Sequence, residues 1–287
     1  MKINNTPPFS LADTRIAILG LGLMGGSLGL ALRGHCRACF AYDPDPVTIT
    51  LALNRQMVDY ASDDPAEILA DADIVILAAP VLAIIDWIER IPSLMPSPAI
   101  IMDLGSTKNQ ICHAFETLPP RFDPIGGHPM TGKEKSGLTQ AEQSLYRDAT
   151  FALSPLSRTS SRARSLALAI IKVIGANEFW IAPALHDRYV AATSHLPYLI
   201  SSALAFATPE ETLTLSGPGF RSTTRLAASS PSLMIDILST NQANILDSIA
   251  SFRTQLDRLE ILLRENNITD LKAALECSAE HINNIRG

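Results

Sequence analysis

Cysteine is scarce in this sequence, with four cysteines among 287 residues. Cys36 and Cys39 stand at the CxxC spacing that redox and metal sites use. No second CxxC motif accompanies them, Cys112 and Cys277 stand alone, and Cys39 falls within an expected buried strand. We therefore interpret Cys36 and Cys39 as structural residues rather than as a functional pair.

Basic residues are too few for a broad phosphate-binding surface. The chain has 23 Lys and Arg against 29 Asp and Glu, which gives a formal net charge of -6 and an isoelectric point near 5.5. Nucleic-acid-binding proteins need clustered positive charge to neutralise phosphates. We therefore expect no nucleic-acid partner, and an anionic ligand must be bound by a few local cations.

Long hydrophobic runs are also missing. The longest run, 74–85, is interrupted by Pro80 and is too short to cross a bilayer. The first residues carry one early lysine but no apolar stretch behind it, so a secretory signal is not expected. The sequence predicts a cytoplasmic protein without a membrane partner.

Short β-rich runs alternate with helical segments in the N-terminal part, which is typical of a parallel sheet covered on both faces. From residue 183 onward the sequence indicates helices only. We predict an α/β fold, with a Rossmann-type dinucleotide-binding domain at 1–182 and an all-helical substrate-binding and dimerisation domain at 183–287. The expected strands are 15–19, 38–42, 74–78, 99–104, 123–125, 150–153 and 178–181.

One long helix is expected to begin at Ser230 and Pro231, because serine is a good N-cap and proline suits the first helical position. Apolar residues then recur mostly at steps of three and four, which predicts one apolar stripe along the helix. A long helix in a small helical domain commonly pairs with a symmetry mate, so we expect a homodimer. The stripe consists of Leu238, Ile245, Ile249, Phe252, Leu256, Leu259 and Leu263.

The sequence GLGLMG, with Gly20, Gly22 and Gly25, follows an expected strand and opens an expected helix. In that context a GxGxxG motif brings backbone N–H groups and a helix N-terminus against a pyrophosphate. Asp43 ends the next strand, where a carboxylate accepts hydrogen bonds from ribose hydroxyls and repels a 2′-phosphate, so we predict NAD as the cofactor. Asp43 could instead cap the next helix. We expect further cofactor contacts from Leu23, Met24, Ala79 and Pro80.

Two polar residues leave neighbouring strand ends near the expected nicotinamide. Ser106 follows AIIMDLG, and His128 lies between two glycines and a proline, in what we interpret as a loop. His128 is therefore the candidate acid/base group, although a loop hydrogen bond would also explain it. His186 and His195 share one expected helix, on opposite faces, and we favour His195 for the site and regard His186 or Asp187 as structural. No HxxxH or HExxH spacing occurs, so we expect no metal.

Several motifs in this order resemble the prephenate and arogenate dehydrogenases of tyrosine biosynthesis. They are GLGLMGGSLGLAL, YD at Asp43, DLGSTK, GGHPMTGKEKSG, HDRYVAATSHLPY and GPGFRSTTRLAASSP, and they span nearly the whole chain. The resemblance implies oxidative decarboxylation of prephenate to 4-hydroxyphenylpyruvate with hydride transfer to NAD. It also implies a helical second domain that forms a dimer.

The resemblance further assigns roles to individual residues. It implies that His128 takes the proton of the ring hydroxyl and that Ser106 hydrogen-bonds His128 and the substrate. Arg225 would bind the ring carboxylate and His195 would line the pocket. Glu134 and Arg221 would lie near the pyruvyl side chain and the site entrance.

The sequence departs from the family pattern at three positions, and these leave the choice of substrate side chain open. Tyr198 stands where a second histidine is common, Met234 where some relatives have a tryptophan, and Ser222 where an aspartate is frequent. Arogenate or an amino-substituted prephenate is therefore an alternative substrate. A 3-hydroxyacid dehydrogenase, which would need a helix lysine, and a catalytically silent NAD-binding protein are the rival interpretations.

Overall fold

The computed structural model describes residues 10–133 and 135–286, with the backbone alone for residues 285 and 286. The chain divides into two compact units between Asn241 and Gln242. This division by internal contacts differs in position from the domain boundary expected between residues 182 and 183. The expected boundary stays a prediction.

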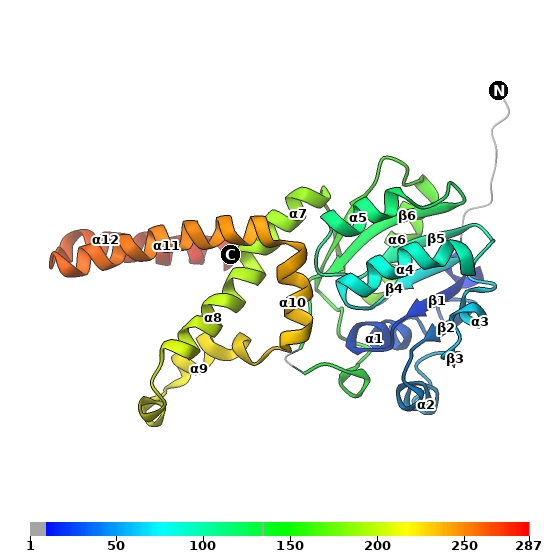
Figure 1. Ribbon diagram of the computed structural model, residues 1–287, viewed down its shortest axis with the longest axis horizontal. Coiled ribbons are helices and arrows are strands. Elements are labelled where there is room, and N and C mark those ends of the chain that lie inside the picture. Colours follow the sequence, from blue (N-terminus) through cyan, green and yellow to red (C-terminus); the bar gives the residue numbers. More distant parts are fainter. Residues whose placement is uncertain (1–9, 134, 287) are drawn as a thin grey trace. The chain divides into compact units, whose positions relative to one another are not determined.

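The first unit is built on an eight-stranded sheet with the order β3-β2-β1-β4-β5-β6-β7-β8 (Figure 1). All neighbouring strands run parallel except β6 and β7, which are antiparallel. The predicted α/β class with a largely parallel sheet is confirmed. The strands are β1 (Arg15–Leu19), β2 (Ala38–Tyr42), β3 (Tyr60–Ser62), β4 (Ile74–Leu77), β5 (Ala99–Asp103), β6 (Phe122–Pro129), β7 (Thr150–Pro155) and β8 (Asn177–Trp180).

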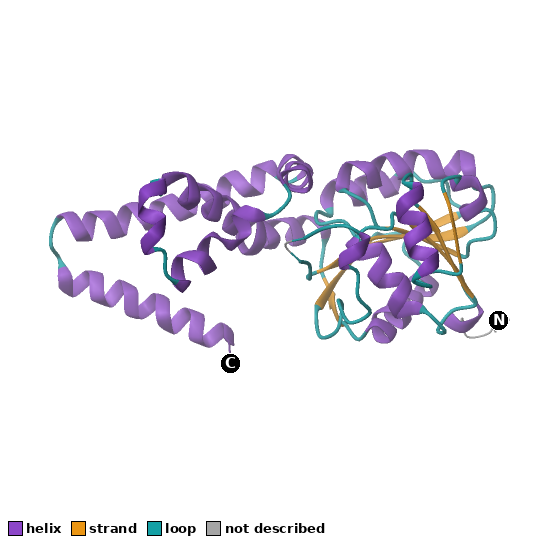
Figure 2. Cartoon of the chain, turned by 90° about the horizontal axis from the view of Figure 1, so that it is seen from below, coloured by secondary structure: helices purple, strands orange, loops and turns teal. Residues whose placement is uncertain are grey.

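Helices cover both faces of this sheet (Figure 2). Ile16 and Ile18 of β1 pack into the hydrophobic cluster of one face, and Ala17 and Leu19 pack into the cluster of the other. Successive strand residues point to opposite faces, so the continuous apolar strands are buried on both sides. One face carries α1 (Leu23–Leu32), α2 (Pro46–Asn54) and α6 (Ser161–Ile174), and the other carries α3 (Pro65–Leu69), α4 (Val81–Leu94) and α5 (Asn109–Glu116).

The strand predictions fail at two places. The three-residue edge strand β3 was not expected, because so short a segment has no readable alternation. Strand β6 continues to Pro129 and contains His128, so the expected loop around His128 is wrong. Pairing with β7, which sets His128 opposite Ala152, extends β6 beyond Ile125, where its pairing with β5 ends.

The rest of the first unit is helical and begins with a continuous stretch, Pro183–Ala207. This stretch is long and apolar enough to span a membrane by length and composition alone, a test that core helices of soluble proteins also pass. Its His186, Asp187 and His195 are buried and hydrogen-bonded within this unit. The elements are α7 (Pro183–Val190), the π-helical turn η3 (Ala191–His195), α8 (Leu196–Ala207), η4 (Glu210–Leu215), α9 (Pro218–Thr224), η5 (Arg225–Ala228) and α10 (Pro231–Thr240), while the short turns η1 (Leu11–Asp13) and η2 (Leu138–Gln140) lie earlier in the chain.

The long helix expected from Ser230 onward is two helices. Pro231 is at the first helical position as predicted, but the Ser230 side chain contacts Ser232 and caps no backbone N–H group. Helix α10 ends at Thr240, because Asn241 leaves helical geometry and its buried amide donates to the Asp187 carbonyl and to His195. The single predicted stripe is therefore interrupted at Asn241.

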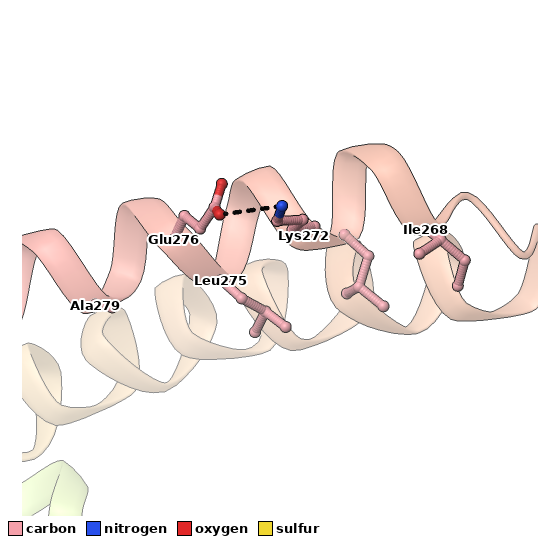
Figure 3. A pocket seen from close by; sticks show the side chains of 6 residues that line it. Ile268, Lys272, Leu275, Glu276 and Ala279 are labelled. Atoms are coloured by element: carbon pink, nitrogen blue, oxygen red, sulfur yellow. Dashed lines mark ion pairs between the residues drawn. The ribbon is translucent and has the colours of Figure 1, made fainter.

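The second unit consists of α11 (Gln242–Arg264) and α12 (Ile268–Arg286), which pack against each other. Large apolar side chains remain exposed on both helices, among them Leu263 at 62% and Ile268 at 59%. Apolar side chains of α12 line a shallow surface pocket (Figure 3). Lys272 and Glu276, which form an ion pair at 3.6 Å, also line it. The residues that line this pocket are Ile268, Leu271, Lys272, Leu275, Glu276 and Ala279.

Candidate active site

The glycine-rich turn joins β1 to α1 and has the geometry of a pyrophosphate-binding loop. Gly20 has φ +107°, and a Cβ on Gly25 would lie 1.9 Å from the Gly20 carbonyl oxygen, so both positions require glycine within the fold itself. Gly22, at the N-cap of α1, has no heavy atom within 4 Å of a Cβ built there. The fold does not need glycine at this position, but a pyrophosphate approaching the backbone does. The turn therefore fits a dinucleotide.

These different surroundings predict different effects of two alanine substitutions. Gly22→Ala should leave the free energy of unfolding unchanged and weaken NAD binding on the order of tenfold or more, because the methyl group enters only the ligand's space. Gly25→Ala should lower the free energy of unfolding by about 1–3 kcal/mol through overpacking. Urea denaturation and NAD titration of both variants measure these effects. Equal destabilisation by the two substitutions would contradict this account of the turn.

Asp43 lies directly after β2, beside the glycine-rich turn. Its Oδ2 accepts from the backbone N–H of Leu21 at 2.9 Å, and its Oδ1 accepts from Asp45 N–H at 3.0 Å. The alternative role, capping the next helix, belongs to Asp45, whose carboxylate accepts from Val47 and Thr48 at the start of α2. The half-buried Asp43 carboxylate therefore keeps free lone pairs that could accept from ribose hydroxyls.

The other predicted cofactor residues lie at the same edge of the sheet. Leu23 and Met24 are the first residues of α1 and are half-buried. Ala79 and Pro80 follow β4, which neighbours β1 in the sheet, and Pro80 is the N-cap residue of α4. The carboxyl ends of β1, β2 and β4 thus lie side by side at one edge of the sheet, which is where parallel sheets bind dinucleotides.

A buried ion pair joins the carboxyl ends of β5 and β6. Lys108 Nζ donates to Asp103 Oδ2 and, at 2.7 Å, to the Gly127 carbonyl oxygen, while Gly127 N–H donates to Asp103 Oδ1 at 3.1 Å. Both side chains are completely buried. Burial raises the pKa of Asp103, whereas the adjacent ammonium of Lys108 opposes this shift. These contacts fix the backbone directly before His128.

His128 lies at this edge and contacts a second histidine. Its Nδ1 is 2.9 Å from His186 Nε2, and His186 Nδ1 is 2.8 Å from Asp187 Oδ1. The Asp187 carboxylate also accepts from the backbone N–H groups of Lys108 and Asn109, at 2.7 and 2.9 Å, and so caps α5 from a distant segment. This carboxylate therefore links α7 to the loop that carries Ser106.

Two histidines around this point, His128 and His195, are held in their neutral forms. Burial lowers the pKa of His128 well below its usual value, and the nearby His186, Lys108 and His195 lower it further. Burial also lowers the pKa of His195 to about 4. The Asn241 amide donates to His195 Nδ1 at 3.2 Å, so the neutral ring carries its proton on Nε2. A neutral His128 can accept a proton at physiological pH.

The single regular α-helix expected to carry His186 and His195 on opposite faces is wrong. Both rings are buried, at 2% and 1% exposure, and both interact electrostatically with His128. The backbone between them turns as a π-helix over Ala191–His195 instead of an α-helix, which changes the angle between the two side chains. The α-helical spacing used in the prediction does not apply to this turn.

The remaining predicted residues occupy less decisive positions. Ser106 is half-buried in the loop after β5 and, among the described residues, makes no hydrogen bond to His128. Arg225 is exposed and begins η5, which packs against α8, the helix that continues from His195. Arg221 is exposed in α9, where Nη2 lies 3.4 Å from the Ser216 carbonyl oxygen. Glu134 lies outside the described residues. The roles of these residues stay predictions.

Sequence reasoning missed several residues of this site. Lys108, Asp103 and Asn241 were not singled out, and His186 and Asp187 were interpreted as structural. The adjacent histidine and aspartate in HDRY were a usable signal, since a carboxylate commonly orients an imidazole. The described part of the chain contains no group of three or more potential metal ligands, and its cysteines are all unpaired.

Two family models match consecutive parts of the chain. The model described as "Prephenate dehydrogenase, nucleotide-binding domain" covers residues 28–179. The model described as "Prephenate dehydrogenase, dimerization domain" covers residues 182–277. Together they include strands β2 to β7 and most of β8, the histidine cluster and most of the helical part.

Individual proteins are similar over nearly the whole chain. A prephenate dehydrogenase of Bacillus subtilis is 30% identical over 91% of this chain and 73% of its own length. The structure of Aquifex aeolicus prephenate dehydrogenase in complex with hydroxyphenyl propionate and NAD+ matches with a TM-score of 0.88 and 28% identity, covering 96% of this chain and 100% of that one. The structure of Synechocystis arogenate dehydrogenase matches with a TM-score of 0.80 and 30% identity, and the match covers 94% of this chain and 99% of that one.

The glycine-rich turn, the histidine at the same edge of the sheet and both family models point to the same class of nicotinamide-dependent oxidoreductase. The chain belongs to the prephenate/arogenate dehydrogenase family of tyrosine biosynthesis.

Proposed function

We propose that this protein is an NAD-dependent prephenate dehydrogenase, which converts prephenate to 4-hydroxyphenylpyruvate and CO2. The observation that supports this most strongly is the neutral His128 at the cofactor edge, backed by His186 and Asp187. A hydroxyl group can be oxidised beside a base that accepts its proton. Bound NAD would supply the hydride acceptor.

In this proposal His128 Nε2 takes the proton of the ring hydroxyl while the carbon that carries this hydroxyl loses hydride. The bond between the ring and its carboxylate then breaks and CO2 leaves. The electron pair of that bond makes the ring an aromatic phenolate, and the protonated His128 returns the proton to its oxygen. Ser106, half-buried in the loop after the neighbouring strand, would hydrogen-bond the substrate hydroxyl. The aromatic product makes the reaction effectively irreversible.

Substrate binding in the proposal depends on the helical part of the first unit. Arg225 would hold the ring carboxylate bidentately, which fixes the ring against the nicotinamide. His195, whose neutral ring has its proton on Nε2, would donate to an oxygen of the substrate. Arg221 and Glu134 would lie towards the pyruvyl side chain and the entrance.

The Asp43 carboxylate is proposed to select NAD over NADP. Asp43→Ser should weaken NAD binding about tenfold through loss of charge-assisted hydrogen bonds, and it should improve NADP binding because a repulsive charge is removed. Asp45→Ser is the matched control, because the Asp45 carboxylate caps α2 and serine also caps a helix. Titration of each variant with both dinucleotides measures the preference. Unchanged rejection of NADP by Asp43→Ser would place the determinant elsewhere.

We also propose a homodimer, because the helical part matches the family's dimerization domain and exposes large apolar side chains on α11 and α12. Apolar surface of this kind is typical of protein interfaces. The cytoplasmic location stays a prediction.

The test of the proposed function is a comparison of substrates. Absorbance of the reduced nicotinamide is followed with prephenate and with arogenate, each with NAD and with NADP. The highest kcat/KM is expected for prephenate with NAD. A preference for arogenate would change the substrate within the family, and dinucleotide binding without turnover of either substrate would support the catalytically silent interpretation. The segment Pro183–Ala207 has no lysine, so a 3-hydroxyacid dehydrogenase finds no support.

A further inference from the structure

Asp187, His186 and His128 form a hydrogen-bonded row of side chains, of which only His128 has a chemical role in the proposal above. His186 and Asp187 are almost completely buried, at 2% and 1% exposure. The row begins at the N-terminus of α5, where Asp187 accepts two backbone N–H groups, and it ends at the ring of the proposed base. All three residues lie in the first compact unit.

The Asp187 carboxylate determines which nitrogen atoms of His186 and His128 carry protons. The Asp187 carboxylate can only accept, so His186 must donate through Nδ1–H. In its neutral form His186 then has an unprotonated Nε2, which accepts from His128 Nδ1–H across the 2.9 Å contact. His128 is left with a free lone pair on Nε2. This is the tautomer that a base needs if it is to take a proton with Nε2.

We propose that His186 and Asp187 are positioning residues, which hold His128 in its Nδ1–H tautomer and stabilise the imidazolium that forms during turnover. This inference rests on the proposed function of His128 as the base. After proton transfer, His128 carries a positive charge close to Lys108 and His195. The Nδ1–H bond to His186, polarised by Asp187, offsets that unfavourable environment. A carboxylate that orients a catalytic imidazole acts in the same way in serine proteases.

The tautomer can be measured without turnover. In the full chain labelled with 15N-histidine, the His128 signals are identified by their loss in His128→Asn. We expect a protonated Nδ1 and an unprotonated Nε2 at neutral pH. In His186→Phe the Nδ1–H group of His128 has no acceptor. The 15N signals of His128 should therefore shift towards those of a mixture of both tautomers. A wild-type His128 protonated on Nε2 would overturn the proposal.

Kinetics with prephenate and NAD provide the second measurement. His186→Phe should lower kcat about 100-fold, by analogy with the loss that follows tautomer misplacement in a catalytic triad, while KM changes less than about threefold. In His186→Gln the amide oxygen can accept from His128 and the amide nitrogen can donate to Asp187. This variant should therefore recover at least about tenfold of the lost kcat. His113→Gln, at an exposed position on α5, is the control.

The outcomes separate the two proposals. Turnover of His186→Phe near that of the wild type, or equal impairment of the Phe and Gln variants, would overturn the positioning role. If the wild-type protein does not oxidise prephenate, the proposed function fails. The 15N measurement then still decides whether the row of residues fixes the His128 tautomer.

Discussion

His128→Asn should lower kcat by at least about two orders of magnitude and leave the KM for prephenate nearly unchanged. The asparagine amide can occupy the place of Nδ1 and donate to His186, so the contact at 2.9 Å has a substitute. It has no group at the position of Nε2. The variant therefore removes the proton acceptor while it keeps the surrounding hydrogen bonds.

The pH profile of the wild-type protein tests the same assignment. Protonation of a base abolishes its function, so kcat/KM should fall as the pH falls through the pKa of His128. Because burial, and to a smaller extent the nearby His186, Lys108 and His195, lower this pKa well below its usual value of 6.5, activity should persist below pH 6.5. Near-normal turnover of His128→Asn across the pH range would exclude His128 as the base. His113→Asn should behave like the wild type, since His113 is exposed.

Most of the sheet could be predicted because its signals are local. Strands β1 and β2 have the predicted bounds, since short runs of apolar residues stand between clear turn signals. The end of β6 could not be predicted, because it depends on antiparallel pairing with β7, more than twenty residues away. The break between α10 and α11 depends on Asn241, whose amide bonds to Asp187 and His195. Pairing and tertiary hydrogen bonds of this kind leave no periodic pattern in the sequence.

In the candidate site, too, the features set by local sequence could be predicted and those set by tertiary contacts could not. The glycine-rich turn and Asp43 were predictable because cofactor binding imposes fixed residue types at fixed spacing. The relation between His128 and His186 joins β6 to α7, and the π-helical turn over Ala191–His195 changes the angle to His195. A sequence pattern based on regular helices cannot anticipate such a turn.

Lys108→Met should have the largest effect on stability, because it leaves the completely buried Asp103 without its cation. The remaining donors to Asp103 are the backbone N–H groups of Gly105 and Gly127, at 2.8 and 3.1 Å. Removing one partner of a buried ion pair typically costs about 3–5 kcal/mol. We expect a loss of this size in the free energy of unfolding, measured by urea denaturation.

Lys108→Met should also impair catalysis, since Lys108 Nζ holds the Gly127 carbonyl directly before His128. The double variant Lys108→Met/Asp103→Asn should recover part of the lost stability, because the uncompensated charge is then gone. Its turnover should stay low, because the Gly127 contact remains absent. Lys133→Met is the control, as it removes a partly exposed ion pair with Glu142 and should cost about 1 kcal/mol or less. If Lys108→Met and Lys133→Met lower the free energy of unfolding equally, the buried pair is not what holds β5 and β6 together next to His128.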